Sequence, residues 1–415
     1  MIRRLSAGAC AAAILSLLAA AAIAQQPSAP PQPPAAAPLP PGSALIGRPE
    51  ENPAAAKLAP IPVPPLPTAA DKLPVGELKL PQGFRVEVYA SGMPNARSLA
   101  LGDKGTVFVG SRVVDKVYAI VNKDGKREVK VLVSGLYRPN GVAFKNGTLY
   151  IAELSQISKI DDVEDKLDSA PKPTVIYSDL PKDEAHGWKF LAVGPDDRLY
   201  FNVGAPCNIC MPDQAHAQLR RIKLDGSGAE VIARGIRQVV GMDFHPASKV
   251  LYFTENQRDW LSEDQPNDKL NRLLNPGTDN FGFPYCDGGD IEDTTYGWGH
   301  SCSEFTKPVL QLGPHVAPLG MRFYTGRMFP EKYRDAIFMA RHGSWNKTQK
   351  IGGDIYVVWL NEDGTVKSHE PFMTGFLQNN DYVGRPVDVL TMPDGSLLVS
   401  DDRNGAVYRI SYGAK

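Results

Sequence analysis

The sequence predicts an all-β protein, a six-bladed β-propeller. Short apolar runs, each preceded by a turn, recur at intervals of roughly 40–50 residues. A second set of hairpin turns lies between them, at Asp124-Gly125, Asp225-Gly226 and Asp363-Gly364. Two hairpins in each repeat give four strands, which is the content of a propeller blade. The apolar runs lie at residues 107–109, 149–151, 199–201, 251–253, 337–339 and 397–399.

The first part of the chain predicts export. Arg3 and Arg4 precede an apolar run, and Ala22-Ile23-Ala24 supplies small residues for cleavage. We therefore expect a signal peptide at residues 1–24 and a periplasmic or secreted mature protein with no membrane span. Residues 25–73 are rich in Pro and Ala, so they predict a flexible linker. The propeller domain is expected over residues 74–415, and a net charge of −1 gives no case for nucleic-acid binding.

The cysteines indicate an oxidising compartment. Of five, Cys10 lies in the predicted signal peptide, and the other four could pair in three ways. Proximity favours Cys207 with Cys210 and Cys286 with Cys302. A metal or redox site at the first pair is the alternative. The chain has no second CxxC to complete a zinc site, and no His follows Cys210 for haem attachment.

Polar residues recur in the loops beside the apolar runs. His186 precedes the hairpin at 190–203, where it could accept a proton near neutral pH. Asp183 or Glu184 would orient it, or else both are solvated loop charges. One polar group from each blade would point to the axis, and together these groups would form a pocket with a surplus of cations. Such a pocket suits an anionic ligand that carries several carboxylates. The loops are Arg138-Pro-Asn-Gly141, His186-Gly187, Arg237-Gln238, Pro314-His315, residues 342–347 and Gly384-Arg385-Pro386.

These motifs together resemble the soluble pyrroloquinoline-quinone (PQQ)-dependent sugar dehydrogenases, and the sorbosone dehydrogenase-like branch in particular. The resemblance spans residues 80–412 and rests on HGWKF, RGIRQVVGMDFHP, ENQRDWLSEDQPNDKLN, NFGFPYC, HGSWNK and GRPVDVLTMPDGSLLVSDD. It implies a six-bladed propeller with PQQ over the mouth of the central channel. It also implies that Ca²⁺ holds the cofactor and that a histidine acts as general base.

The resemblance assigns roles to individual residues. His186 matches the catalytic base, and the carbonyls of Gly282, Phe283 and Pro284 match calcium ligands. The chain departs from the family's pattern at Gln238, Lys269 and Gly313, where the family has Asn, an acidic residue and a tryptophan-containing segment. The residues that match cofactor-binding positions are Asn140, Arg237, Gln238, His315, Lys347 and Arg385.

The implied reaction is oxidation of a sugar, or of a related alcohol or aldehyde hydrate, by hydride transfer to the quinone. With no haem motif, electrons would leave to a separate acceptor, a cytochrome or a quinone. One alternative is a calcium-dependent propeller lactonase that needs no quinone. Another is a non-catalytic secreted propeller that binds a glycan or a protein, which the departures at Lys269 and Gly313 would fit. The long segment 256–322 either carries part of the site or is a plain insertion.

Overall fold

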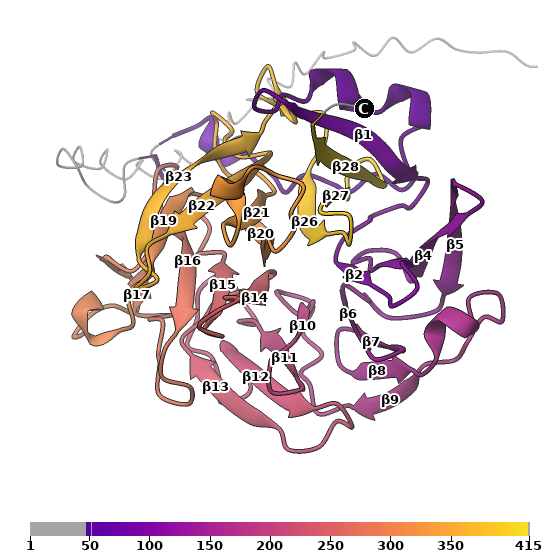
Figure 1. Cartoon of the computed structure of the whole chain (residues 1–415). Helices are drawn as coiled ribbons and strands as arrows, with labels where there is room; N and C mark the ends of the chain where they lie inside the picture. The colour runs from indigo at the N-terminus through magenta and orange to yellow at the C-terminus, as the bar shows by residue number, and fades with distance from the viewer. Residues whose placement is uncertain (1–46, 51, 414–415) are drawn as a thin grey trace, which may run out of the picture. The chain divides into compact units, whose positions relative to one another are not determined.

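Six four-stranded antiparallel sheets surround a common axis in the computed structural model, which describes residues 47–50 and 52–413 (Figure 1). The innermost strands of neighbouring sheets contact one another in a closed ring. The prediction of an all-β, six-bladed propeller is therefore confirmed. The predicted signal peptide and the first half of the predicted linker lie outside the described residues.

The first three sheets use their strands in chain order from the axis outward. Each apolar run of the sequence becomes the second strand of its sheet. Both faces of that strand are covered by neighbouring sheets, so its residues are buried without alternation. The strands are β2 (Leu99–Leu101), β3 (Val107–Val109), β4 (Val117–Lys123), β5 (Lys126–Val133), β6 (Gly141–Lys145), β7 (Thr148–Ala152), β8 (Ile157–Ile160), β9 (Thr174–Tyr177), β10 (Leu191–Val193), β11 (Arg198–Val203), β12 (Gln218–Lys223) and β13 (Glu230–Arg234).

The fourth and fifth sheets follow the same order, with an insertion before the last strand of the fourth. The sixth sheet takes its outermost strand, β1, from the beginning of the propeller and pairs it with β28, which closes the ring. The strands are β14 (Met242–Phe244), β15 (Leu251–Glu255), β16 (Asn267–Leu273), β19 (Leu310–Pro314), β20 (Pro318–Phe323), β21 (Ile337–Arg341), β22 (Asp354–Leu360), β23 (Val366–Met373), β26 (Pro386–Thr391), β27 (Leu397–Asp401), β28 (Ala406–Tyr412) and β1 (Phe84–Ser91).

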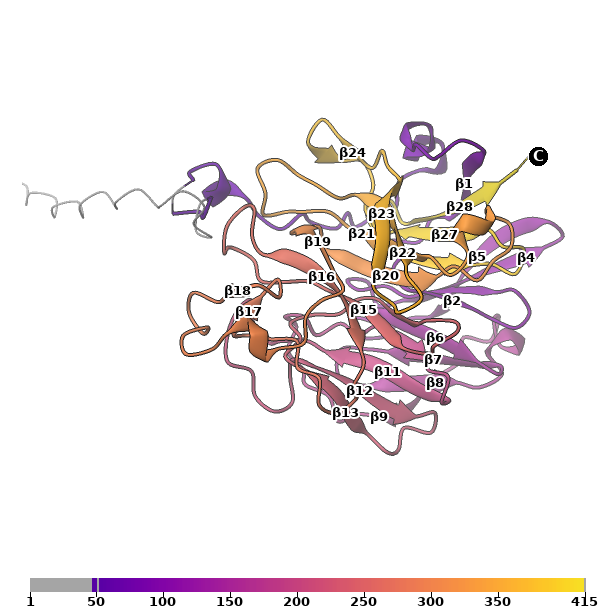
Figure 2. The same cartoon turned by 60° about the vertical axis from the view of Figure 1, so that its left-hand side comes forward.

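The hydrophobic core is divided among the interfaces between neighbouring sheets. Between the first two sheets, for example, Phe108 and Phe144 stack with ring centroids 5.9 Å apart. Such a core needs both neighbours, since a single sheet buries only part of its apolar surface. The turned view in Figure 2 shows the sheets as successive layers from β4–β5 to β13.

The remaining elements lie in loops and in the segment before the propeller. The insertion between β16 and β19 holds a short hairpin and the Cys286–Cys302 disulfide, and Cys207 pairs with Cys210. The pairing favoured by proximity is therefore confirmed. The elements are η1 (Ala55–Lys57), η2 (Ala70–Lys72), η3 (Pro74–Glu77), η4 (Val163–Asp165), η5 (Cys302–Glu304), η6 (Glu331–Tyr333), β17 (Cys286–Asp287), β18 (Ile291–Glu292), β24 (Leu377–Gln378) and β25 (Asp381–Tyr382).

Part of the predicted linker contacts the propeller. Ala55 is fully buried, and Thr68 Oγ1 donates a 2.7 Å hydrogen bond to Asn404 Oδ1. Composition had indicated a segment without a core, because proline and alanine bury little surface. Contacts at a few positions are nevertheless enough to place residues 52–73 on the propeller. No helix in the described residues is both long and apolar enough to cross a membrane.

Candidate active site

A cavity of about 200 Å³ lies at the axis, where the innermost strands begin and the second strands end. In an antiparallel hairpin the start of one strand and the end of the next lie at the same edge. Loops before β10, β14, β20 and β26 and after β3, β15 and β21 therefore meet there. This cavity is called the site cavity below.

His186 lies in the loop before β10 and lines the site cavity. Its Nδ1 lies 2.8 Å from the Ala205 carbonyl, so Nδ1 carries the proton and Nε2 is left as an acceptor. A Cβ on Gly204 would lie 2.6 Å from that of His186, so glycine is needed for this approach. Burial, and then the charge of Arg237, lowers the pKa of His186 to about 3. The imidazole is therefore neutral at physiological pH.

The two carboxylates expected to orient the His186 ring bond to other residues instead. Asp183 Oδ2 lies 3.1 Å from His216 Nε2, and Glu184 forms an ion pair of 2.8 Å with Arg138. In the amide orientation that satisfies both of its polar atoms, Gln238 donates to the His186 carbonyl at 3.0 Å. The ring of His186 is thus oriented by a backbone carbonyl.

Three arginines of the site cavity are bonded to the protein. Arg237 donates to Asp259 Oδ2 at 3.0 Å and to Asn208 Oδ1 at 2.8 Å. Arg385 donates to the Gly343 carbonyl at 2.8 Å. Arg97 donates to Asp402 Oδ2 at 2.6 Å, and this pair is almost fully buried. Their guanidinium groups are thus fixed in place before any ligand binds.

Arg112 differs from these three. Its guanidinium carbon lies 4.5 Å from the centroid of the Trp188 ring. Within residues 47–50 and 52–413, its Nε has no hydrogen-bond partner although it is buried. Burial, and then the charge of Arg97, lowers the pKa of Arg112 to about 10, which leaves it charged at neutral pH. An unpaired cation in a cavity favours an anionic ligand, since a buried charge without a partner is costly.

Two further histidines line the site cavity. His315 has both ring nitrogens occupied, with Nε2 2.8 Å from the Ser262 carbonyl and Nδ1 3.3 Å from Asn346 Nδ2. His342 Nε2 lies 2.9 Å from Asp402 Oδ1, and burial lowers its pKa to about 3. His186 is bound to a neutral carbonyl, whereas His342 is coupled to a carboxylate that Arg97 also holds.

Five of the residues assigned from sequence line this cavity, and five do not. Asn140 lies beneath it, where Oδ1 accepts from Arg97 Nε at 2.6 Å. Lys347 turns away and donates to Asp264 Oδ1 at 2.7 Å. The residues that line the cavity are His186, Arg237, Gln238, His315 and Arg385, and the turn Gly282–Pro284 lies outside it.

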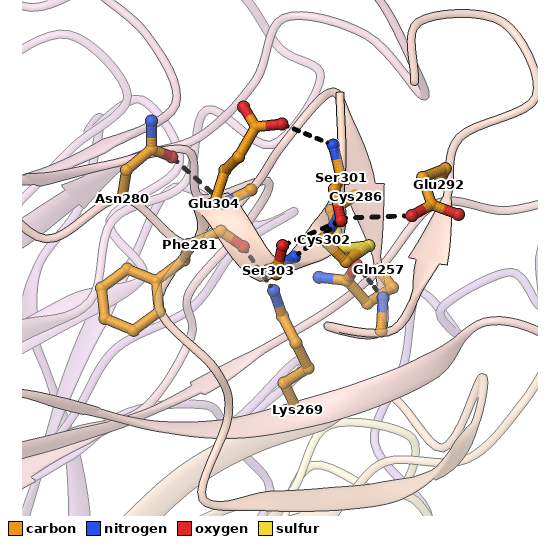
Figure 3. The surroundings of a disulfide bond; sticks show 12 residues. Gln257, Lys269, Asn280, Phe281, Cys286, Glu292, Ser301, Cys302, Ser303 and Glu304 are labelled. Carbon is orange, nitrogen blue, oxygen red and sulfur yellow. Dashed lines mark hydrogen bonds between the residues drawn. A yellow bond between two sulfur atoms is a disulfide. The ribbon is translucent and has the colours of Figure 1, made fainter. Parts of the chain in front are cut away.

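One of the three carbonyls expected to bind calcium, that of Gly282, is already hydrogen-bonded. The Gly282 carbonyl accepts from the amides of Tyr285 at 2.7 Å and Cys286 at 2.9 Å. Lys269 Nζ donates to the Phe281 carbonyl at 2.9 Å (Figure 3). The same ammonium group also pairs with Glu255 at 3.1 Å. These bonds occupy the Gly282 carbonyl and place an ammonium group on the neighbouring Phe281 carbonyl, which disfavours a divalent ion at that end of the turn. Within the described residues no hydrogen bond reaches the carbonyls of Phe283 and Pro284, so calcium binding by the turn stays a prediction. No cluster of three acidic, His or Cys side chains suited to a metal occurs in the described chain.

Sequence reasoning assigned no individual role to several residues of the site cavity, although His342 and Asn346 lie in the rim loop 342–347 that it named. Arg112 and His342 follow the second strands of their blades by three residues and one, and Arg97 precedes an innermost strand by two. These positions follow the same phase as His186 and Arg237, so the repeat itself could have indicated them. The lining residues without an assigned role include Arg97, Arg112, Trp188, Asp259, Asp268, His342 and Asn346.

The protein is thus a β-propeller with a cavity at its axis that is lined by four arginines. A family model for glucose/sorbosone dehydrogenases matches residues 152–409, which is more than half of the chain. The protein therefore belongs to the glucose/sorbosone dehydrogenase family.

Individual relatives agree with this. The chain is 31% identical over 351 residues to an uncharacterized protein of Borreliella burgdorferi, covering 81% of this chain and 91% of that one. It is 24% identical over 408 residues to a pyrroloquinoline quinone-dependent pyranose dehydrogenase of Coprinopsis cinerea, covering 80% of this chain and 54% of that protein.

Solved structures share the fold. The holo form of the pyranose dehydrogenase PQQ domain from Coprinopsis cinerea aligns with a TM-score of 0.69 at 20% identity. The alignment covers 84% of this chain and 98% of that domain. At this identity the likeness supports the architecture, and the chemistry of the site has to be argued from the residues of this chain.

Proposed function

We propose that this protein is a PQQ-dependent dehydrogenase that oxidises a sugar, or a related alcohol or aldehyde hydrate, with His186 as general base. Membership of the family and the pyranose dehydrogenase relative support the class of enzyme. The observation that carries the proposal is His186 itself, whose free Nε2 lies in a cavity beside arginines.

The residues of the site cavity fit PQQ, a planar quinone with three carboxylates. Arg112 has an unpaired Nε, and Arg237 and Arg385 are held rigidly by the protein. Charge-assisted hydrogen bonds from fixed guanidinium groups suit carboxylates and quinone oxygens. Gln238 and His315 would contact the cofactor from the same wall. Asn140 and Lys347 would act indirectly, through Arg97 and through the loop at Asp264.

When bound, PQQ supplies a carbon that accepts hydride. The protein's part is to bind, orient and deprotonate the substrate. Nε2 of His186 accepts the hydroxyl proton, while the Ala205 carbonyl holds the tautomer in which Nε2 is free. The charge of Arg237, fixed by Asp259, would stabilise negative charge that develops in the cavity.

Calcium binding stays a prediction that rests on the family resemblance. The Gly282 carbonyl is already bonded, so calcium would be held by the carbonyls of Phe283 and Pro284 or would bind at another position. Chelation tests this: calcium at either position predicts loss of quinone on adding EDTA and recovery on adding calcium. Unchanged quinone binding after exhaustive chelation would remove calcium from the proposal.

The proposal is tested by reconstituting the protein with PQQ and measuring dye reduction with a panel of sugars, alcohols and lactones. His186→Gln should lower turnover by roughly 10²–10⁴-fold, with a smaller change in KM. The matched control is His369→Gln, since His369 is exposed on β23 and does not line the site cavity. Acid release from lactones without quinone would support the lactonase alternative. Binding without any turnover would support the non-catalytic alternative.

We further propose that the protein acts outside the cytoplasm and passes electrons to a separate cytochrome or quinone. Both described cysteine pairs are disulfides, which is typical of oxidising compartments. Residues 1–24 would be removed on export. N-terminal sequencing of the mature protein is expected to begin near Gln25, and a soluble cytoplasmic pool that retains Met1 would contradict export.

A further inference from the structure

Residues 58–67, LAPIPVPPLP, form an extended segment that we call the strap. Five of its ten residues are proline, which fixes the backbone and removes amide donors. In the described structure no hydrogen bond joins residues 59–67 to the rest of the chain. The strap is therefore held mainly by its two ends.

Both ends are bonded to loops of the propeller. Before the strap, Asn52 Nδ2 donates to Glu263 Oε1 at 2.9 Å, and Glu263 lies between β15 and β16 of the fourth sheet. After the strap, Thr68 donates to Asn404 twice, from its amide at 2.9 Å and from Oγ1 at 2.7 Å. Asn404 lies between β27 and β28 of the sixth sheet. The strap thus runs from the fourth sheet to the sixth.

Between these ends the strap forms part of the wall of the site cavity. Pro60 and Ile61 line it together with His186, Arg237 and Arg385. The cavity that remains is about 200 Å³, whereas sites for drug-sized ligands measure roughly 300–1,000 Å³. A three-ring quinone and a sugar together need more room than this. This step rests on the proposed function.

We propose that the strap is a displaceable lid: it covers part of the site cavity in the ligand-free protein, and binding of the full ligand requires it to move away at Ile61. The energetic basis is that few interactions hold the strap closed. Opening breaks no ladder of backbone hydrogen bonds, so it belongs to the local, low-energy motions of a folded protein. Part of the free energy of quinone binding is then used to open the strap. Weakening an end of the strap lowers that cost, so it should raise the affinity for the quinone.

The closed position is tested by thiol labelling in a Cys10→Ser background, where the four remaining cysteines are paired. Ile61→Cys should react at least tenfold more slowly than Leu66→Cys, since Leu66 is 75% exposed. Adding Thr68→Val removes one hydroxyl hydrogen bond and should speed labelling at position 61 about three- to tenfold. Labelling at position 66 should not change. Equal rates at the two positions, or no effect of Thr68→Val, would overturn the lid.

Displacement is tested by titrating PQQ. Thr68→Val should raise the affinity about three- to tenfold, whereas Thr365→Val, which removes a hydroxyl from a remote hairpin, should not. Bound PQQ should also bring labelling at position 61 close to that at position 66. A lower affinity, or slower labelling at position 61 with PQQ bound, would show that the strap closes over the ligand, and displacement would be wrong. If no variant binds PQQ, the proposed function fails, while the labelling of the ligand-free protein still decides whether the strap is a lid.

Discussion

The axis of the propeller contains two cavities of similar size. They differ in whether the charged groups beside them are already hydrogen-bonded within the protein. The site cavity measures about 200 Å³. A second, the axial cavity, measures about 220 Å³ and is lined by the innermost strands themselves, with Asp243 and Arg322 among their residues. The apolar side chains of Val240, Leu319 and Val387, with Trp188, form a cluster among the residues at the axis.

Charges at the axial cavity are bonded within the protein. Arg322, which lines the axial cavity, donates to Asp388 at 3.3 Å, and Asp388 also accepts from the amides of Leu99 and Val389, each at 2.9 Å. Asp243 accepts from the amide of Phe323 at 2.8 Å. These carboxylates join innermost strands of neighbouring sheets. In the site cavity, by contrast, Arg112 Nε has no partner in the described chain. The two cavities have similar volumes. They differ because the site cavity contains a polar group that is free to bond a ligand.

The largest effect should come from breaking the axial pair. Arg322→Met leaves Asp388 buried without its cation, and removal of one partner of a buried pair costs roughly 3 kcal/mol or more. Chemical denaturation measures the loss of unfolding free energy. Arg322→Lys, which keeps the charge, is the control and should lose less. Quinone affinity should stay within about twofold, and a selective loss of affinity would show that the axial cavity also serves the ligand.

Arg112 should show the opposite behaviour. Arg112→Gln removes a cation with no partner for its Nε, so the thermal midpoint should be unchanged or slightly higher. Quinone affinity should fall roughly 10–100-fold, the worth of one hydrogen bond to a charged group. Isothermal titration and a thermal melt of the same samples measure both. A marked loss of stability with unchanged affinity would mean that Arg112 is structural.

The smallest effect concerns the charge of His186. Its pKa is lowered to about 3, so in the ligand-free protein the ring should remain neutral from pH 8 down to about pH 4. Arg237→Gln should shift this pKa upward, because a repelling charge is removed, but burial, the larger cause, persists. NMR titration of the histidine ring signals measures the shift. An unchanged pKa would show that Arg237 does not act on His186.

The fold could be predicted because its signal is local. Each second strand is a continuous apolar run after a turn, as at Val107–Val109, and such runs need no knowledge of distant partners. The pairing of the first and last strands, which closes the ring, could not be predicted from local sequence. Val86 pairs with Ile410, and nothing in either segment specifies a partner so far along the chain.

The site was predicted where position in the repeat decides the direction of a side chain. His186, Arg237 and Arg385 precede innermost strands and reach the cavity. Lys347 comes from a motif of the same kind, but Asp264 in a loop of another sheet draws its ammonium away. The strap could not be predicted for a different reason. Hydrogen bonds at its two ends place Ile61 at the cavity, and amino-acid composition gives no sign of those bonds.

The pairing of β1 with β28 has a consequence for the completeness of the polypeptide. The sixth sheet needs strands from both ends of the propeller, so a chain that stops before Ala406 cannot form it. Such a product leaves β27 with an open edge and β1 without a partner, and unpaired edges attract proteases and other strands. We therefore expect products that stop before the last strand to be cleaved by proteases faster than the complete propeller.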